Sequence, residues 1–241
     1  MLETDAKIKF EVAQKNFENK NYKKAQKLWL EILDYYPKNL SVLRNVALAF
    51  YHDDDLEKAQ MILKKIIKIN KKEPKALVML ILILERQDKI DETKQYIDLG
   101  IKENILDKHW EVKKKMMLPT IFEDVKDIDE SRNELLKYIQ EVLDSNKKIS
   151  LDIESQLIKP VQFNLSYSQH NNLEINKKCA NFFRKIYPQL NNVHKLKNTS
   201  NSKIRIGFIS DYLTDHTIGK LFKGIILNLD KNKFDIKIFH T

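Results

Sequence analysis

The sequence predicts a mainly α-helical protein: a solenoid of helix pairs, then a helical linker, then one strand–helix–strand unit that opens a Rossmann-like α/β domain. Three observations predict this order. A pattern of 34 residues repeats through the first part of the chain, only four glycines and five prolines interrupt the 241 residues, and the apolar spacing changes near the carboxyl end. Few glycines and prolines favour helices, whereas the change of spacing indicates strands.

Small and bulky residues recur every 34 positions between residues 5 and 105. A small residue in each of two paired helices lets the helices approach closely, and a bulky residue fills the groove beside them. These sets are Val12-Ala13, Val46-Ala47 and Leu80-Ile81; Ala25, Ala59 and Thr93; and Trp29, Leu63 and Ile97. The pattern is the signature of about three tetratricopeptide repeats. Ile81 and Thr93 replace alanine, as is typical of a terminal repeat that meets a different neighbour.

Two roles are open for such repeats. Their surface can dock a protein or peptide substrate, or the repeats can brace the region that follows. The run Asp53-Asp54-Asp55 suggests a cation site. It lies between paired helices, however, where carboxylates stabilise a helix amino terminus, so we interpret it as capping.

Residues 106–159 lose the 34-residue period but keep a helical pattern. Met116 and Met117 are interpreted as core fillers. After them, apolar residues at helical spacing predict one amphipathic helix, and these residues are Leu135, Leu136, Ile139, Val142 and Leu143. We therefore expect a helical connector between the repeats and residues 160–241.

The last stretch, residues 203–241, changes from strand to helix and back to strand. Ile204–Ile209 is an apolar run typical of a buried strand, residues 218–229 have amphipathic helical spacing, and Phe234–Phe239 predicts a second strand. Two parallel strands with one helix leave an apolar face and two strand edges open. We therefore expect that the chain is the front part of a longer protein, or that a partner completes the sheet.

Composition limits the partners and cofactors. The net charge is +9, but the lysines are spread along the chain among acidic residues, so we expect no nucleic-acid binding. No apolar segment is long enough to span a bilayer and no signal-peptide pattern is present, so we expect no membrane association. The single cysteine, Cys179, fits a reducing, cytoplasmic compartment and is interpreted as a buried filler. No His or Cys spacing predicts a metal site.

Three motifs of the last stretch carry a family resemblance, and they are Lys203–Phe208, Asp215–Phe222 and Lys233–Asp235. They resemble the start of the catalytic region of the O-GlcNAc transferase/SPINDLY-like glycosyltransferases of the bacterial type. Upstream, Phe163 and Leu165–Tyr167 resemble the stretch that precedes the first catalytic strand in this family. The resemblance covers nearly the whole chain but only the opening of the catalytic region, residues 160–241.

The resemblance also implies an activity and a site. Transfer of a sugar from a UDP-sugar to Ser or Thr requires a positioned acceptor hydroxyl, a base for its proton and stabilisation of the leaving diphosphate. His216 lies in the loop after the first strand and matches the active-site histidine of the family, so it is the candidate catalytic residue. Tyr212 stands where members often have an acidic residue, so no carboxylate role is carried over.

In the family a second Rossmann-like domain holds the UDP-sugar. This stretch contains no such domain and no glycine-rich phosphate loop, so we expect no cofactor or metal site in it. We expect UDP-sugar binding only together with a further carboxyl-terminal part. As an alternative to a catalytic role, His216 has a structural role in which it only orders the loop. The other histidines, which receive no role, are His52, His109, His170, His194 and His240.

One more helix is expected before the polar linker 197–203. Its buried side is predicted to consist of Leu173, Ala180, Phe183 and Ile186, with Pro188 ending it. Two classes of function remain open for the whole chain. It is either the amino-terminal part of a UDP-sugar-dependent protein O-glycosyltransferase, inactive alone, or a repeat adaptor that binds proteins without catalysis.

Overall fold

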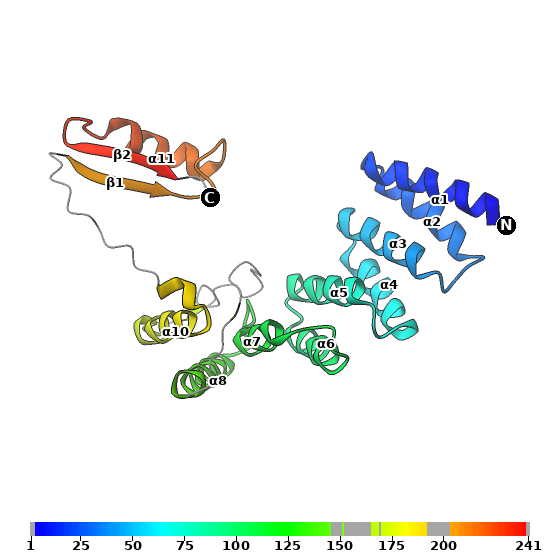
Figure 1. The fold of residues 1–241 in the computed structure, drawn as a ribbon, viewed down its shortest axis with the longest axis horizontal. Helices are drawn as coiled ribbons and strands as arrows, with labels where there is room; N and C mark the ends of the chain where they lie inside the picture. Colours follow the sequence, from blue (N-terminus) through cyan, green and yellow to red (C-terminus); the bar gives the residue numbers. More distant parts are fainter. Residues whose placement is uncertain (1–2, 146–150, 152–164, 169, 192–202, 240–241) are drawn as a thin grey trace. The chain divides into compact units, whose positions relative to one another are not determined.

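The computed structural model describes residues 3–145, 151, 165–168, 170–191 and 203–239, and the chain divides into two compact units, Met1–Asn192 and Val193–Thr241. The first unit begins with six helices in which each packs against the next (Figure 1). They are α1 (Glu3–Glu18), α2 (Tyr22–Leu33), α3 (Leu40–His52), α4 (Leu56–Ile69), α5 (Pro74–Arg86) and α6 (Ile90–Lys102). The second helices begin at residues 22, 56 and 90, which are 34 apart, so the predicted tetratricopeptide-like pairs are confirmed.

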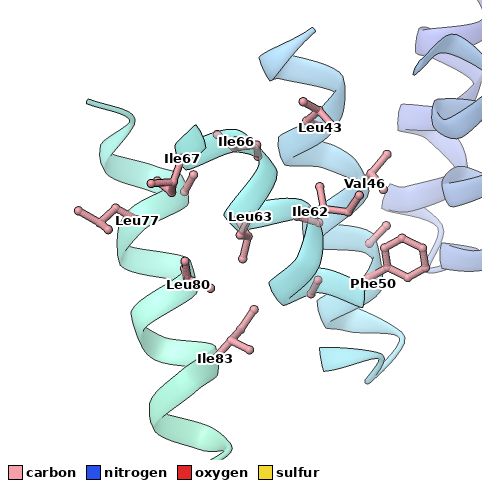
Figure 2. Packing of buried hydrophobic residues seen from close by; sticks show 14 of the residues in the cluster. Leu43, Val46, Phe50, Ile62, Leu63, Ile66, Ile67, Leu77, Leu80 and Ile83 are labelled. Carbon is pink, nitrogen blue, oxygen red and sulfur yellow. The ribbon is translucent and has the colours of Figure 1, made fainter. Parts of the chain in front are cut away.

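One apolar core runs through these pairs, and Figure 2 shows its part between α3, α4 and α5. The small residues Ala25 and Ala59 are fully buried. The bulky residues Trp29, Leu63 and Ile97 are at most 1% exposed. Thr93 replaces the third alanine, and its hydroxyl donates to the Lys89 carbonyl at 2.8 Å, so the buried polar atom has a partner. The predicted register of the repeats is therefore the packing register.

The first helix of each pair ends in the same tight turn. Lys20, Asp54 and Asp88 have φ angles of 60°, 62° and 58°, and the next residue donates its N–H to the carbonyl five residues before it. This is a Schellman motif, in which glycine is the usual residue because a side chain strains the left-handed conformation. The chain uses three non-glycine residues there, at a spacing of 34.

The helical register continues for one helix beyond the three predicted repeats. Helix α7 (Lys108–Met116) begins 34 residues after Pro74 and packs against α6. Gly100 makes room for the turn between the two helices, because a Cβ there would lie 2.4 Å from the Leu106 side chain, which precedes α7. The prediction that the period is lost at residue 106 is therefore wrong for one helix. Lys114 and Lys115 stand where the earlier repeats have their small apolar pair, which hides the repeat in the sequence.

A second apolar cluster joins α7 to α8 (Val125–Asp144) and α10 (Leu173–Ile186). The predicted amphipathic helix is α8, whose buried residues are Leu135, Ile139 and Val142, and Met116 and Met117 are buried as expected. Asp124 and Asp127 form a capping box at its start. By its contacts α10 belongs to the first unit with this connector, and a short 3₁₀ helix, Pro188–Asn191, follows it.

The predicted buried face of α10 is confirmed for Ile186, wrong for Leu173 and only partly right for Ala180 and Phe183. Leu173 is 58% exposed, and Ala180 and Phe183 are only half-buried. The helix turns a different stripe inward, formed by Ile175, Cys179, Phe182 and Ile186, which follow one another at helical spacing. The Phe182 ring meets Tyr138 of α8 at 5.8 Å between centroids, and Cys179 is a buried filler as expected. Phe163 lies outside the described residues, as do positions 197–202 of the linker.

The second unit is a parallel strand–helix–strand unit. Strands β1 (Ile204–Ile209) and β2 (Phe234–Phe239) pair in parallel from Ile204↔Phe234 to Ile209↔Phe239, and α11 (Thr217–Asn228) connects them (Figure 1). Half-buried residues alternate along β1 at Ile206 and Phe208, so they share one face. Apolar side chains of this unit remain exposed in the structure, among them Ile204, Ile209, Leu221, Ile225, Leu227 and Phe239.

A large side chain at Ala59 is expected to destabilise the second helix pair. Ala59 is fully buried in α4, which packs closely on α3, so Ala59→Leu overpacks this contact and lowers the free energy of unfolding by about 1–3 kcal/mol. Denaturant unfolding measures the change, and Lys65→Leu on the exposed side of α4 is the control, expected within about 0.5 kcal/mol of wild type. Equal effects of the two substitutions would contradict the packing register.

Glycine at position 20 is expected to stabilise the first pair. Lys20 is exposed and strained at φ 60°, so Lys20→Gly raises the free energy of unfolding by about 1 kcal/mol. Lys24→Gly, at an exposed position inside α2, is the matched control and lowers it by about 0.5–1 kcal/mol. Thermal melts that move the same way for both variants would show that the turn carries no strain.

Candidate functional site

The candidate catalytic residue lies in the loop between β1 and α11, residues 210–216, at the carboxyl end of a parallel strand. Ligands of open α/β sheets bind at this edge. The loop packs tightly on the first turn of the helix, because a Cβ at Gly219 would lie 2.1 Å from the Thr214 carbonyl oxygen. Glycine is therefore required at position 219, where it permits the close approach of the loop to α11.

His216 is the N-cap residue of α11. Its backbone is extended, and its Nδ1 accepts a hydrogen bond from the Ile218 N–H at 3.2 Å. A neutral imidazole has one N–H donor and one acceptor nitrogen. Because Nδ1 accepts, the neutral ring carries its hydrogen on Nε2. In this arrangement the exposed ring can donate from Nε2 to an oxygen of a ligand, whereas action as a base requires the proton to move to Nδ1 and the cap to break.

Two neighbours define the surroundings of His216. The Tyr212 ring lies against the imidazole, with 4.7 Å between the centroids and 34° between the planes. Asp215 pairs with Lys220, Nζ to Oδ1 at 3.0 Å. The residue four positions before the histidine is thus an aromatic partner that orients the imidazole ring. The sequence identified both positions but not their contact.

The other described histidines have structural surroundings. His170 Nε2 lies 2.8 Å from Asp129 of α8, and His109 Nδ1 lies 3.0 Å from Asp107. His52 ends α3 and stacks on Tyr22 with 5.3 Å between the ring centroids. His194 and His240 lie outside the described residues. Among the residues that the structure describes, no group of three or more His, Cys, Asp or Glu side chains is placed to hold a metal ion.

The acidic run is a capping device, as the sequence indicates. Asp53 is the C-cap residue of α3, Asp54 adopts the left-handed turn, and Asp55 is the N-cap residue of α4, accepting from the Lys58 N–H at 3.1 Å. Hydrogen bonds from the Lys58 ammonium and from its backbone N–H hold the pKa of the Asp55 carboxyl below its ordinary value. Asp54 in addition pairs with Arg86 at 2.9 Å.

The repeats also form a groove that the sequence did not identify. It lies between α3 and α5, the first helices of two successive pairs, and has a volume of about 480 Å³. We call it the α3–α5 groove, and its lining is Leu48 and Tyr51 with Pro74, Lys75, Val78, Met79 and Leu82. A signal was present, since Leu48 and Leu82 are 34 residues apart and therefore lie on the same face of successive pairs. They are half-buried and 47% exposed, respectively.

No protein family model matches the sequence, and no curated protein matches it. Solved structures match at low similarity. A crystal structure of MamA has 13% identity and a TM-score of 0.46, covering 80% of this chain and 97% of its own. The TPR domain of Sgt2 from Aspergillus fumigatus has 18% identity and a TM-score of 0.37, covering 62% and 88%. A mutant O-GlcNAc transferase of Thermobaculum terrenum has 10% identity and a TM-score of 0.41, covering 98% of this chain and 37% of its own.

None of the helices in the described ranges is long and apolar enough to cross a membrane.

The amide of Ile218 is expected to report the cap that His216 provides. The Ile218 N–H donates to His216 Nδ1 at 3.2 Å, so His216→Ala removes the acceptor and leaves this amide without its partner. Hydrogen exchange of Ile218 should therefore accelerate in His216→Ala relative to wild type, measured against neighbouring amides. His216→Asn keeps an acceptor at this position, so its Ile218 amide should exchange at about the wild-type rate. Equal exchange rates in the Ala and Asn variants would contradict the observed cap.

Proposed function

We propose that this chain is the amino-terminal part of a UDP-sugar-dependent protein O-glycosyltransferase of the O-GlcNAc transferase type, whose repeats dock the protein substrate. The observation that carries the proposal is the parallel β1–α11–β2 unit with His216 at the strand-to-helix loop, in the same chain as protein-docking repeats. The exposed apolar side chains of that unit support a wider sheet in the complete protein.

In this proposal His216 acts on the acceptor side of the reaction. Its Nε2 hydrogen donates to the acceptor oxygen or to a phosphate oxygen of the UDP-sugar, and the Tyr212 ring fixes the orientation of the imidazole. Proton removal from the acceptor then requires a shift of the ring proton to Nδ1. The UDP-sugar is a substrate held mainly outside this stretch, and the proposal includes no metal ion.

The second candidate is a repeat adaptor without catalysis, and one observation favours it. His216 caps α11 through Nδ1, which is a structural role sufficient to account for a histidine in this loop. The α3–α5 groove serves a docking function in both candidates. The two candidates therefore assign different roles to His216 and the same docking role to the repeats.

Two substitutions of His216 separate the candidates, made in the full-length protein that contains this stretch. Transfer from UDP-GlcNAc to a protein acceptor is measured per folded molecule, together with the melting temperature. If His216 positions the acceptor or moves its proton, both His216→Asn and His216→Ala lower turnover by about 10²- to 10⁴-fold. The Asn variant keeps the cap, so its melting temperature should equal that of wild type.

A histidine that only caps α11 gives a different pattern. His216→Asn then retains full turnover, and His216→Ala lowers the melting temperature while turnover per folded molecule stays normal. That result contradicts a catalytic histidine and supports the adaptor.

A further inference from the structure

One side of α4 carries lysines and no acidic residue. The stretch from residue 58 to residue 72 contains neither Asp nor Glu, and its lysines are Lys58, Lys64, Lys65, Lys68, Lys71 and Lys72. The buried side of α4 packs on α3 and α5 (Figure 2), so the lysines lie on the side that faces solvent. Lysines are spread among acidic residues along the chain, but here they gather on one side of α4 and just beyond its end.

Most of these lysines lack an acidic partner. Lys58 pairs with Asp55, and Lys64 pairs with Glu92 of α6. The other four form no ion pair with any residue that the structure describes, and all four are exposed. This part of the surface therefore keeps a positive charge that the folded chain does not neutralise.

Three of the lysines surround a hollow of about 420 Å³ in the surface of α4. Its lining consists of Gln60, Met61, Lys64, Lys65 and Lys68. Met61, Lys65 and Lys68 follow one another at the i, i+4, i+7 spacing of one helix stripe. Met61 is 61% exposed. An apolar side chain thus lies beside cations on the outside of the helix.

Helix α2 carries the same combination. Residues 19–30 also contain neither Asp nor Glu, and their exposed lysines are Lys20, Lys23, Lys24 and Lys27. Lys27 and Met61 are 34 residues apart, so they occupy equivalent places in successive helix pairs. Leu30 of α2 and Ile69 of α4 are each 38% exposed. We call the exposed lysines of residues 19–30 and 58–72, together with Leu30, Met61 and Ile69, the basic face.

The composition of the basic face fits a phospholipid surface better than a nucleic acid. Nucleic-acid sites are typically rich in arginine and in exposed aromatic rings, but residues 58–72 contain neither arginine nor an aromatic residue. Lysine is a point charge on a long stem, which suits an extended negative surface. Exposed apolar side chains between lysines are typical of protein surfaces that lie at the membrane interface.

We propose that the basic face binds the anionic phospholipid surface of a membrane. The lysines are attracted to the negative headgroups, and the hollow beside Lys64, Lys65 and Lys68 receives a headgroup phosphate. Met61 enters the boundary between the headgroups and the acyl chains. We expected no membrane association because the sequence has no spanning segment and no signal-peptide pattern, but binding to a membrane surface requires neither. This inference goes beyond the proposed function and does not depend on the role of His216.

Vesicle co-sedimentation of the complete 241-residue chain tests the proposal. One set of vesicles consists of phosphatidylcholine, and the other of equal amounts of phosphatidylcholine and phosphatidylserine. Wild type should sediment only with the anionic vesicles, and less so as added salt screens the charges. Each lysine near such a surface contributes about fivefold to partitioning, so Lys65→Gln combined with Lys68→Gln should lower the partition coefficient about 25-fold. Met61→Gln should lower it about threefold.

Matched controls change the same residue types outside the basic face. Lys137→Gln combined with Lys177→Gln removes the same charge from exposed positions of α8 and α10, and its partition coefficient should stay within about twofold of wild type. Leu82→Gln replaces an exposed apolar residue of α5 and is the control for Met61→Gln. All these side chains are exposed, so circular dichroism spectra should equal that of wild type.

Three outcomes overturn the inference. Equal losses in the two double variants would show that only the net charge matters, and equal binding to both kinds of vesicle would exclude recognition of the anionic headgroups. The third is the absence of vesicle binding, whether or not inorganic phosphate, polyglutamate or RNA shifts the amide resonances of Lys65 and Lys68. None of these outcomes decides the glycosyltransferase proposal, which is tested separately by turnover of the His216 variants.

Discussion

The close contact of paired helices through alanine is the constraint on which the first unit depends. Ala25 and Ala59 are fully buried, and each lies early in a helix that packs on the preceding one. Because the contact recurs every 34 residues, each pair presents the same side to its neighbours. Leu48 and Leu82 therefore lie at equivalent positions of α3 and α5, and the groove between those helices is a consequence of the repeat. The groove and the core have the same origin.

The repeats were predictable because their pattern is determined by packing. Small and bulky residues at fixed spacing gave the number of pairs and their register, and the change of apolar spacing predicted β1, α11 and β2. Helix α7 was not recognised as a continuation of the repeats, because Lys114 and Lys115 replace the apolar pair of the earlier repeats. Its first residue nevertheless keeps the 34-residue spacing. The predicted buried face of α10 was partly wrong because this helix has two apolar stripes. The contact of Phe182 with Tyr138 on α8 and the burial of Ile175, Cys179 and Ile186 show which stripe is inside.

The sequence predicted where the candidate site lies, but not which contacts its side chains make. The strand-to-helix loop and His216 follow from the sequence pattern and the family resemblance. The cap from Ile218 to Nδ1 does not, because it depends on the side-chain torsions of one loop residue. The contact of Tyr212 with His216 depends on the same loop conformation, which Gly219 permits. The α3–α5 groove was not predicted for another reason. Its residues have the composition of an ordinary repeat core, and only their exposure distinguishes them from core residues.

The packing of paired helices through alanine is tested most directly by native-state hydrogen exchange of the Ala59→Leu variant in the full chain. The opening free energies of amides in α3 and α4 should fall, because the two helices lose their close contact. Amides in β1, α11 and β2, which belong to the second compact unit, should keep their wild-type values. A uniform fall in both units, or no fall in α3 and α4, would contradict a helix-pair contact at this alanine.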